Sequence, residues 1–276
     1  MAIQTKTFSV DFGDIWRSAL HVQHQERLVP ENDRTFWQRS AATYEQRVSV
    51  PGSYDQTLGW IEAKLDPGDT LLDVGCGDGR FALPLATKTS QITAIDYSPE
   101  MLQLLMQKAA TSGIENIIPV EGNWPDVDVA EHDVVLAAWA MYRQLDIERA
   151  VAQLIRTTRK TLVIAMSDAY DAPHRRLIRA LVGPDHEPVE PLYLYIAGVM
   201  RKLGIRPNIQ MLHETRSFQF DTLDEALEIL VPGDLADDVR AGVMGALPGI
   251  LESLDGRYRY SFRIPVAMIF WERREE

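Results

Sequence analysis

An apolar run that leads directly into closely spaced glycines is the feature of this sequence that most restricts its fold. Residues 70–74 read TLLDV, and GCGDG follows at positions 75–79. Glycines at alternate positions let a chain turn tightly and approach a ligand that a Cβ atom would exclude. Open α/β sheets bind ligands at the carboxyl ends of their strands, where such turns lie. The stretch therefore predicts a buried strand, a ligand-binding turn and the start of a helix.

From about residue 70, short apolar runs alternate with helical patterns. Continuous apolar runs separated by amphipathic helices are typical of a parallel sheet buried on both faces. Ser98, Pro99 and Gly113 are the residues expected at the start and end of one of these helices. The predicted strands are TLLDVG, QITAID, NIIPVEG, HDVVLAAWA and TLVIAMS.

The segments around this core predict additional elements. Residues 1–60 carry several aromatic side chains on probable helices and are expected to form a helical cover, while residues 61–276 form one domain with a helical insertion at about 168–206. The last third predicts a strand NIQMLHETRSFQF, a helix that opens with the capping box Thr222 to Glu225, and a helix around 234–254. Period-two alternation from 258 to 270 predicts a final strand, in which Pro265 favours a bulge or a bend.

Composition excludes several classes of protein. The formal net charge of −12 disfavours nucleic acid and anionic lipid as partners, because both require clustered Lys and Arg. No stretch approaches the roughly 18 to 20 apolar residues of a membrane span, and the first residues do not resemble a secretory signal. The single cysteine, Cys76, cannot form an internal disulfide, which fits a reducing cytoplasm. We therefore expect a cytoplasmic protein with a small-molecule substrate.

Two acidic residues distinguish between possible ligands of the glycine turn. A dinucleotide site has the pattern Gly-x-Gly-x-x-Gly, but Arg80 stands at the third glycine position. Asp73 precedes the turn, where a carboxylate is poorly placed beside a pyrophosphate but could help to hold a cationic ligand. Asp96 ends the second strand, where a carboxylate can accept hydrogen bonds from both ribose hydroxyls. The pattern favours an aminoacyl nucleoside over NAD.

Four stretches in this order resemble the class I S-adenosylmethionine-dependent methyltransferases over roughly residues 60–170. They are LLDVGCGDGRFALPLA, AIDYSPEML, EGNWPDV and HDVVLAAWAMY. The resemblance implies a Rossmann-like, mostly parallel sheet of seven strands in the order 3-2-1-4-5-7-6, with the final strand antiparallel. It also implies S-adenosylmethionine as the cofactor and S-adenosylhomocysteine as its product.

The resemblance further implies a cofactor site. The three glycines of the turn would pass close to the methionine part, and Asp96 would hold the ribose. Asn123 stands where the family often has an aspartate at the adenine amino group, and Trp124 beside it is a possible stacking surface. A leading helix that contains Trp37 and Tyr44 would close over the cofactor. The predicted cofactor-binding residues are Asp73, Gly75, Cys76, Gly77, Gly79, Asp96, Tyr97, Met101, Asn123, Trp124, Ala138, Trp139, Trp37 and Tyr44.

Direct displacement on an activated methyl group requires alignment more than acid or base catalysis, so the lack of an evident catalytic triad does not argue against an enzyme. Elements above the carboxyl edge of the sheet offer substrate contacts, namely Tyr142, His174, Tyr193 and Tyr195. The remaining histidines show no ligand spacing with carboxylates, so no metal is expected. Two alternatives remain open, a non-catalytic cofactor-binding regulatory or scaffold protein and an NAD-linked oxidoreductase, which Arg80 disfavours.

Overall fold

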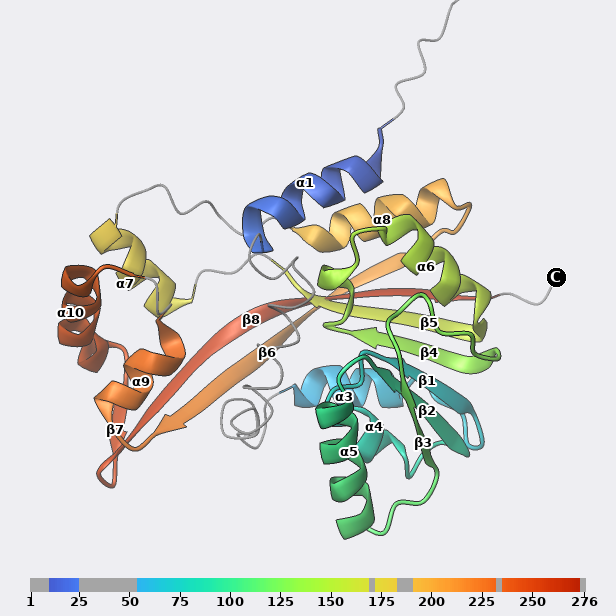
Figure 1. Ribbon diagram of the computed structural model, residues 1–276, viewed down its shortest axis with the longest axis horizontal. Coiled ribbons are helices and arrows are strands. Elements are labelled where there is room, and N and C mark those ends of the chain that lie inside the picture. Colours follow the sequence, from blue (N-terminus) through green and yellow to red (C-terminus); the bar gives the residue numbers. More distant parts are fainter. Residues whose placement is uncertain (1–9, 25–53, 169–171, 183–190, 232–234, 274–276) are drawn as a thin grey trace, which may run out of the picture.

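A twisted sheet of eight strands forms the centre of the molecule (Figure 1). The computed structural model describes residues 10–24, 54–168, 172–182, 191–231 and 235–273. The strands lie in the order β3-β2-β1-β4-β5-β8-β6, with β7 paired to β8. The Rossmann-like fold and the predicted strand order are confirmed, and β7 is an addition to the seven strands expected. The strands are β1 Thr70–Val74, β2 Gln91–Asp96, β3 Ile117–Glu121, β4 His132–Ala138, β5 Thr158–Ser167, β6 Asn208–Phe220, β7 Glu252–Leu254 and β8 Arg257–Glu272.

The first five strands are parallel, and the central ones are apolar on both faces. Leu71 and Leu72 are neighbours on β1 and therefore point to opposite faces, yet both are fully buried. Each belongs to a different apolar cluster, one on either side of the sheet. The continuous apolar runs of the sequence thus reflect a sheet that is covered on both faces.

Helices cover both faces of this parallel part (Figure 1). One layer contains α3 Asp55–Glu62, α4 Ala82–Leu85 and α5 Pro99–Thr111, and the other contains α1 Phe12–His24, α6 Ile147–Arg156 and α8 Leu192–Lys202. The predicted limits of α5 are confirmed, since the Ser98 hydroxyl accepts a hydrogen bond from the Met101 N–H at 3.3 Å and Gly113 follows the helix with φ +67°. Within the described ranges, no helix has both the length and the apolar character needed to cross a bilayer.

The antiparallel strands β6 and β8 extend beyond the sheet as a two-stranded ribbon (Figure 1). Only residues 266–272 of β8 pair with β5, whereas its pairing with β6 continues to Tyr258. The free part carries α7 Pro173–Val182, α9 Leu223–Leu230 and α10 Asp237–Ala246. We call this part the ribbon lobe. Its aromatic side chains are buried against one another, and they include Phe218, Phe220, Tyr260 and Phe262.

The last third of the chain departs from the prediction in the length of one helix. The helix expected around 234–254 is wrong in its extent, since α10 ends at Ala246, a 3-10 turn follows at Leu247–Gly249 and β7 begins at Glu252. Asp255 and Gly256 both adopt positive φ and form the two-residue turn from β7 into β8. Of the bulge or bend expected at Pro265, the bulge is absent, since the register between β6 and β8 passes through Pro265 without a shift. Pro265 lies just beyond the last residue paired with β5, and a missing backbone donor is tolerated there.

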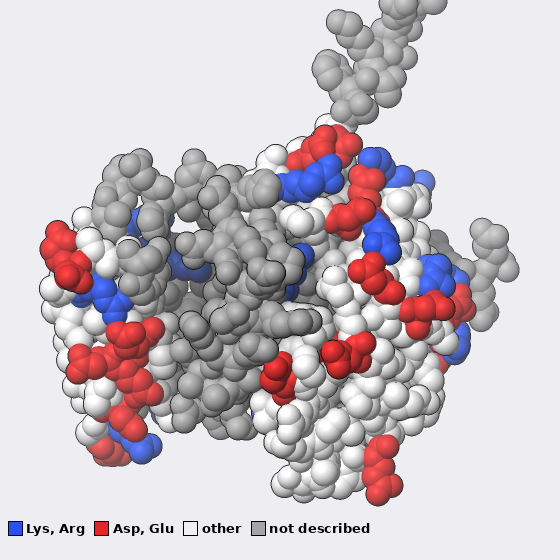
Figure 2. Space-filling view, in the orientation of Figure 1, with Lys and Arg blue, Asp and Glu red and all other residues white. Residues whose placement is uncertain are grey.

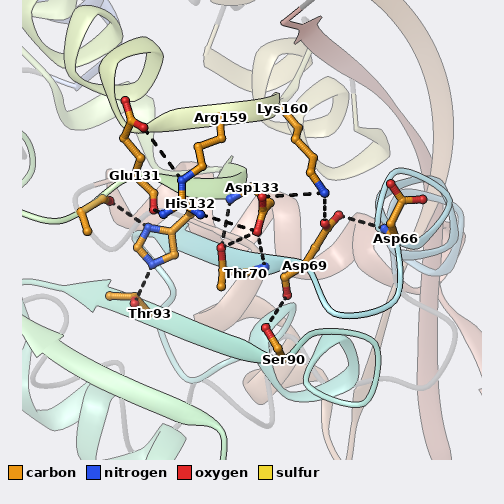
Figure 3. A network of polar contacts seen from close by, with 11 residues as sticks. Asp66, Asp69, Thr70, Ser90, Thr93, Glu131, His132, Asp133, Arg159 and Lys160 are labelled. Carbon is orange, nitrogen blue, oxygen red and sulfur yellow. Dashed lines mark hydrogen bonds and ion pairs between the residues drawn. The ribbon is translucent and has the colours of Figure 1, made fainter. Parts of the chain in front are cut away.

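Polar contacts join the parallel strands near their amino-terminal ends, at the opposite end of the strands from the glycine turn (Figure 3). The Asp133 carboxylate on β4 accepts hydrogen bonds from the backbone N–H of Thr70 at 3.0 Å and from its hydroxyl at 2.8 Å. Lys160 on β5 forms an ion pair with the buried Asp69, which precedes β1. His132 Nε2 lies 2.8 Å from the hydroxyl of Thr93 on β2. These contacts link four adjacent strands and support their register.

Candidate active site

A cavity of about 730 Å³ opens at the carboxyl ends of the parallel strands. This volume lies within the range of about 300–1,000 Å³ that is usual for small-molecule sites. Its walls come from the glycine turn after β1 and from the segments that follow β2, β3 and β4. The predicted site residues that line it are Asp73, Gly75, Cys76, Gly77, Asp96, Tyr97, Met101, Asn123, Trp124, Ala138, Trp139 and Tyr142.

The glycine turn adopts backbone angles that other residues rarely adopt. Gly75, Gly77 and Gly79 all have positive φ, and a Cβ atom at Gly75 would lie 2.5 Å from the Cβ of Ala140. Gly79 does not line the cavity; a Cβ there would lie 2.2 Å from Leu105 in the core. The first two glycines therefore shape the cavity, whereas the third allows the following helix to pack against α5.

Asp96, at the end of β2, is held by the backbone around it. One carboxylate oxygen accepts a hydrogen bond from the Gly77 N–H and the other from the Ser98 N–H, both at 2.9 Å. Burial raises the pKa of this carboxyl, while the hydrogen bonds from Ser98 and Gly77 act in the opposite direction. Each oxygen keeps capacity for a further hydrogen bond, so the pair fits two adjacent sugar hydroxyls.

Asp73, at the end of β1, is buried without compensation. One of its carboxylate oxygens has no hydrogen-bond partner among the described residues, and only 2% of the residue is exposed. Burial, together with the nearby charge of Asp96, raises the pKa of Asp73 to about 7. A buried carboxylate without a partner is unfavourable, and a bound cation would relieve it. The two acidic side chains therefore fit a ligand that combines a sugar with a positively charged group.

The segments after β2 and β3 enclose the part of the cavity that lies beyond Asp96. Asn123 and Trp124 follow β3, and the buried Trp124 indole N–H donates a hydrogen bond to the carbonyl of Ala150 at 3.2 Å. The guanidinium of Arg143 lies over the ring of Tyr97, 4.6 Å from its centroid. An amide and two aromatic surfaces could hold a purine at this end.

Aromatic rings enclose the opposite end of the cavity, at β4. Trp139 directly follows β4 with φ +53°, and its indole N–H donates a hydrogen bond to the Ser167 hydroxyl at 2.8 Å. Phe81 stacks parallel to this indole at 5.9 Å between centroids, and Tyr54 meets it edge-on at 4.7 Å. The cavity thus has a polar end, after β2 and β3, and an aromatic end, after β4.

Several predicted site residues lie elsewhere. His174 is in the ribbon lobe, where its Nδ1 lies 2.8 Å from the Tyr260 hydroxyl and burial lowers its pKa to about 4. Tyr193 and Tyr195 on α8 pack against the apolar core and do not line the cavity. Trp37 and Tyr44 lie outside the described residues. In the part of the chain that the structure describes, no group of three His, Cys, Asp or Glu side chains gathers as a metal site would require.

Sequence reasoning missed some of the cavity. Phe81 directly follows the glycine turn and Arg149 lies in the first turn of α6, and both line the walls together with Glu121 and Asp126. Tyr54 contacts Trp139 from outside the cavity lining. Only the position of Phe81, immediately after the turn, offered a sequence signal for its place in the wall.

Comparison with known proteins identifies a family model and relatives that match this chain. A family model described as a methyltransferase domain matches residues 71–161. The 2-phytyl-1,4-naphtoquinone methyltransferase of Nostoc sp. PCC 7120 is 30% identical over 167 residues, which cover 55% of this chain and 72% of that protein. An uncharacterized protein of Haemophilus influenzae is 26% identical over 225 residues, covering 80% of this chain and 81% of that protein.

Solved structures show the same fold. A methyltransferase from Geobacter sulfurreducens in complex with S-adenosyl-L-homocysteine superposes with a TM-score of 0.52 at 17% identity, covering 85% of this chain and 97% of that one. Another such complex, from Thiobacillus denitrificans, gives a TM-score of 0.51 at 16% identity with the same coverage of 85% and 97%.

The fold and the cavity define a Rossmann-like enzyme that binds a nucleoside cofactor. The chain belongs to the class I S-adenosylmethionine-dependent methyltransferases. The cofactor, when bound, would supply a methyl group activated by a positively charged sulfur: an electron pair of the acceptor forms a bond to the methyl carbon as the carbon–sulfur bond breaks, which leaves S-adenosylhomocysteine. The unpartnered oxygen of Asp73 and the two oriented oxygens of Asp96 fit this cofactor, which carries an ammonium group and a sulfonium group as well as a ribose.

Proposed function

We propose that this enzyme methylates a small organic acceptor by direct displacement. The observation that supports the proposal is a cavity of about 730 Å³, which runs from the carboxylate of Asp96 to the aromatic end at Trp139. Both a cofactor and a small acceptor fit within such a volume. Alignment of the acceptor behind the methyl group supplies most of what the reaction needs, since the leaving sulfur is already activated.

The proposal gives each end of the cavity a role. Asp96 would accept hydrogen bonds from the ribose hydroxyls, Asn123 and Trp124 would hold the adenine, and Asp73 would face the cationic part of the cofactor. Gly75 and Gly77 would let the backbone approach the methionine moiety. The remaining predicted lining residues are Cys76, Tyr97, Met101, Ala138 and Trp139, with Tyr142 at the rim.

The charge of the protein supports a small acceptor over a nucleic acid. The formal net charge is −12, and on the face shown in Figure 2 the basic side chains lie singly or in small groups beside acidic ones. A phosphate backbone requires clustered Lys and Arg. An rRNA uracil methyltransferase of Klebsiella pneumoniae is 33% identical over 85 residues, but these cover only 18% of that protein.

The Nostoc relative also supports a small acceptor, because its name specifies a naphthoquinone and the match covers most of its length. We further propose that the enzyme acts in the cytoplasm, in keeping with its single cysteine, Cys76.

Transfer of a labelled methyl group tests the proposal. The enzyme is incubated with S-adenosylmethionine labelled at the methyl group and, separately, with the small-molecule, RNA and protein fractions of a cell extract. We expect label in the small-molecule fraction. An Asp96→Ala variant, which loses the ribose contacts, serves as the control for enzyme-dependent transfer. Label confined to RNA or protein would contradict the proposal.

A further inference from the structure

We infer that the acceptor is a flat, unsaturated ring and that it packs on the indole of Trp139. This inference rests on the proposed function, and it assigns a substrate class to the aromatic end of the cavity. The surface concerned is formed by Trp139 with Phe81 and Tyr54 behind it, and we call it the aromatic wall.

The position of the aromatic wall follows from the strand order. Asp96 and Asn123 lie at the ends of β2 and β3, and Asp73 lies at the end of β1. A cofactor held by its ribose at the end of β2 and by its amino-acid part at the end of β1 would have the sulfonium, which joins these two parts, near the end of β1 and beside β4, the next strand of the sheet. Trp139 directly follows that strand. An acceptor that approaches the methyl group in line must therefore pass beside this indole.

The Trp139 backbone and indole are fixed by hydrogen bonds. Positive φ is uncommon for a non-glycine residue, and it persists only where the surroundings impose it. Here the Trp139 backbone N–H donates to the Ala165 carbonyl and its indole N–H donates to the Ser167 hydroxyl, both at 2.8 Å. Strand β5 thus determines the plane of the indole before any acceptor binds. A surface oriented in advance loses little conformational freedom on binding.

The third ring of the aromatic wall is held from the opposite side. Tyr54 lies at the start of α3, 6% exposed, and the Arg80 guanidinium lies over its ring, 4.6 Å from the centroid. The buried Glu214 carboxylate on β6 accepts a hydrogen bond from the Thr57 N–H in the first turn of α3. Strand β6 therefore fixes the start of this helix, and with it the ring that meets Trp139 edge-on.

The shape of the aromatic wall favours a planar ligand. Phe81 lies parallel to the indole within 5°, and Trp139 is partly exposed and lines the cavity. Aromatic rings attract other aromatic rings in offset-stacked or edge-on arrangements beyond what buried area alone supplies. A saturated ring of the same size is puckered and touches a flat surface at fewer points. An unsaturated ring is therefore expected to bind about two- to tenfold more tightly than its saturated counterpart.

Two probes with the same carbon skeleton test this expectation. The enzyme is first saturated with S-adenosylhomocysteine, and the binding of 2-naphthol and of decahydro-2-naphthol is then measured by calorimetry. Both probes carry one hydroxyl group, but only 2-naphthol is planar. We expect 2-naphthol to bind about two- to tenfold more tightly than decahydro-2-naphthol, and to quench tryptophan fluorescence.

Variants assign the effect to the aromatic wall. Trp139→Leu is expected to remove the preference for 2-naphthol, and Trp139→Phe to keep part of it. Trp271→Leu is the matched control, because Trp271 pairs with Leu162 near the opposite edge of the sheet. Should Trp139→Leu fail to fold, Ser167→Ala releases the indole without removing it, and is expected to reduce the preference while affinity for S-adenosylhomocysteine is kept.

The outcomes separate the two proposals. Failure of the parent enzyme to bind S-adenosylhomocysteine would reject the proposed function itself. Binding of S-adenosylhomocysteine together with equal affinity for the two probes, or with no binding of 2-naphthol, overturns only the inference of a flat acceptor. The same holds for a preference that survives unchanged in Trp139→Leu.

Discussion

Replacing Asp73 by asparagine should make the stability of the ligand-free protein less sensitive to pH. Burial and the charge of Asp96 raise the pKa of Asp73 from 3.8 to about 7. Between these values the folded protein keeps a proton that the unfolded chain has released, so the free energy of unfolding falls as pH rises through this interval. A difference of about three pKa units corresponds to about 4 kcal/mol at about 1.36 kcal/mol per unit.

The expected result is a stability difference that grows with pH. Near pH 4 the carboxyl of Asp73 is neutral in the folded protein, and Asp73→Asn should differ from the parent only by the small cost of fitting an amide. Above pH 7 the parent carries the unpartnered charge, and Asp73→Asn should have gained up to about 4 kcal/mol relative to it. Urea denaturation between pH 4.5 and 8.5, without cofactor, measures both curves.

An exposed carboxylate on the rim of the same cavity supplies the control. Asp126 forms an ion pair with Arg149 at 2.8 Å, and more than half of each side chain is exposed. Asp126→Asn should leave the shape of the pH profile unchanged. Parallel curves for Asp73→Asn and the parent across the whole range would refute the reasoning, because they would mean that the buried carboxylate is compensated in the folded protein.

Three further variants test individual contacts. Asp96→Ala should weaken the binding of S-adenosylhomocysteine by about 10- to 150-fold in calorimetry, since a hydrogen bond to a charged group contributes about 1.5–3 kcal/mol; unchanged affinity would exclude the ribose contact. Glu214→Leu should lower the free energy of unfolding by about 1–3 kcal/mol by leaving the Thr57 N–H unpaired, and Glu214→Gln should recover most of this loss in the same urea titration. Gly79→Ala should destabilise by about 1–3 kcal/mol more than Gly68→Ala, because both positions have φ near +90° but only Gly79 lacks room for a Cβ atom; equal losses would show that strain alone matters.

The parallel half of the molecule could be predicted from the sequence because its signals are local. Strand β1, the glycine turn and the cap of α5 each occupy a few consecutive residues, and each imposes its structure through burial or backbone geometry. The contact between Asp96 and Gly77 follows from the parallel pairing of β1 and β2, which brings the two strand ends to one edge. This explains why most of the residues predicted for the cofactor line the cavity.

The ribbon lobe and the aromatic wall depend on contacts between distant parts of the chain. The residues Thr57 and Glu214 are 157 positions apart, and the sequence around either residue gives no sign that it contacts the other. His174 resembled a residue above the sheet, but the extension of β6 and β8 carries it into the ribbon lobe. The turn at Asp255 and Gly256 did have a local signal for a hairpin, since Asp-Gly is a favoured two-residue turn, but the helical pattern before it was extended too far.

The same buried charge links folding, cofactor binding and specificity in this enzyme. An ionised Asp73 destabilises the ligand-free protein, and a cation bound beside it removes that penalty. A positively charged ligand removes this cost when it binds, and its affinity at neutral pH is therefore higher by the same free energy. A neutral nucleoside that fits the contacts of Asp96 equally well would not recover it. On the proposed function, Asp96 would thus recognise the sugar, whereas Asp73 would distinguish a cationic cofactor from other nucleosides of the same size.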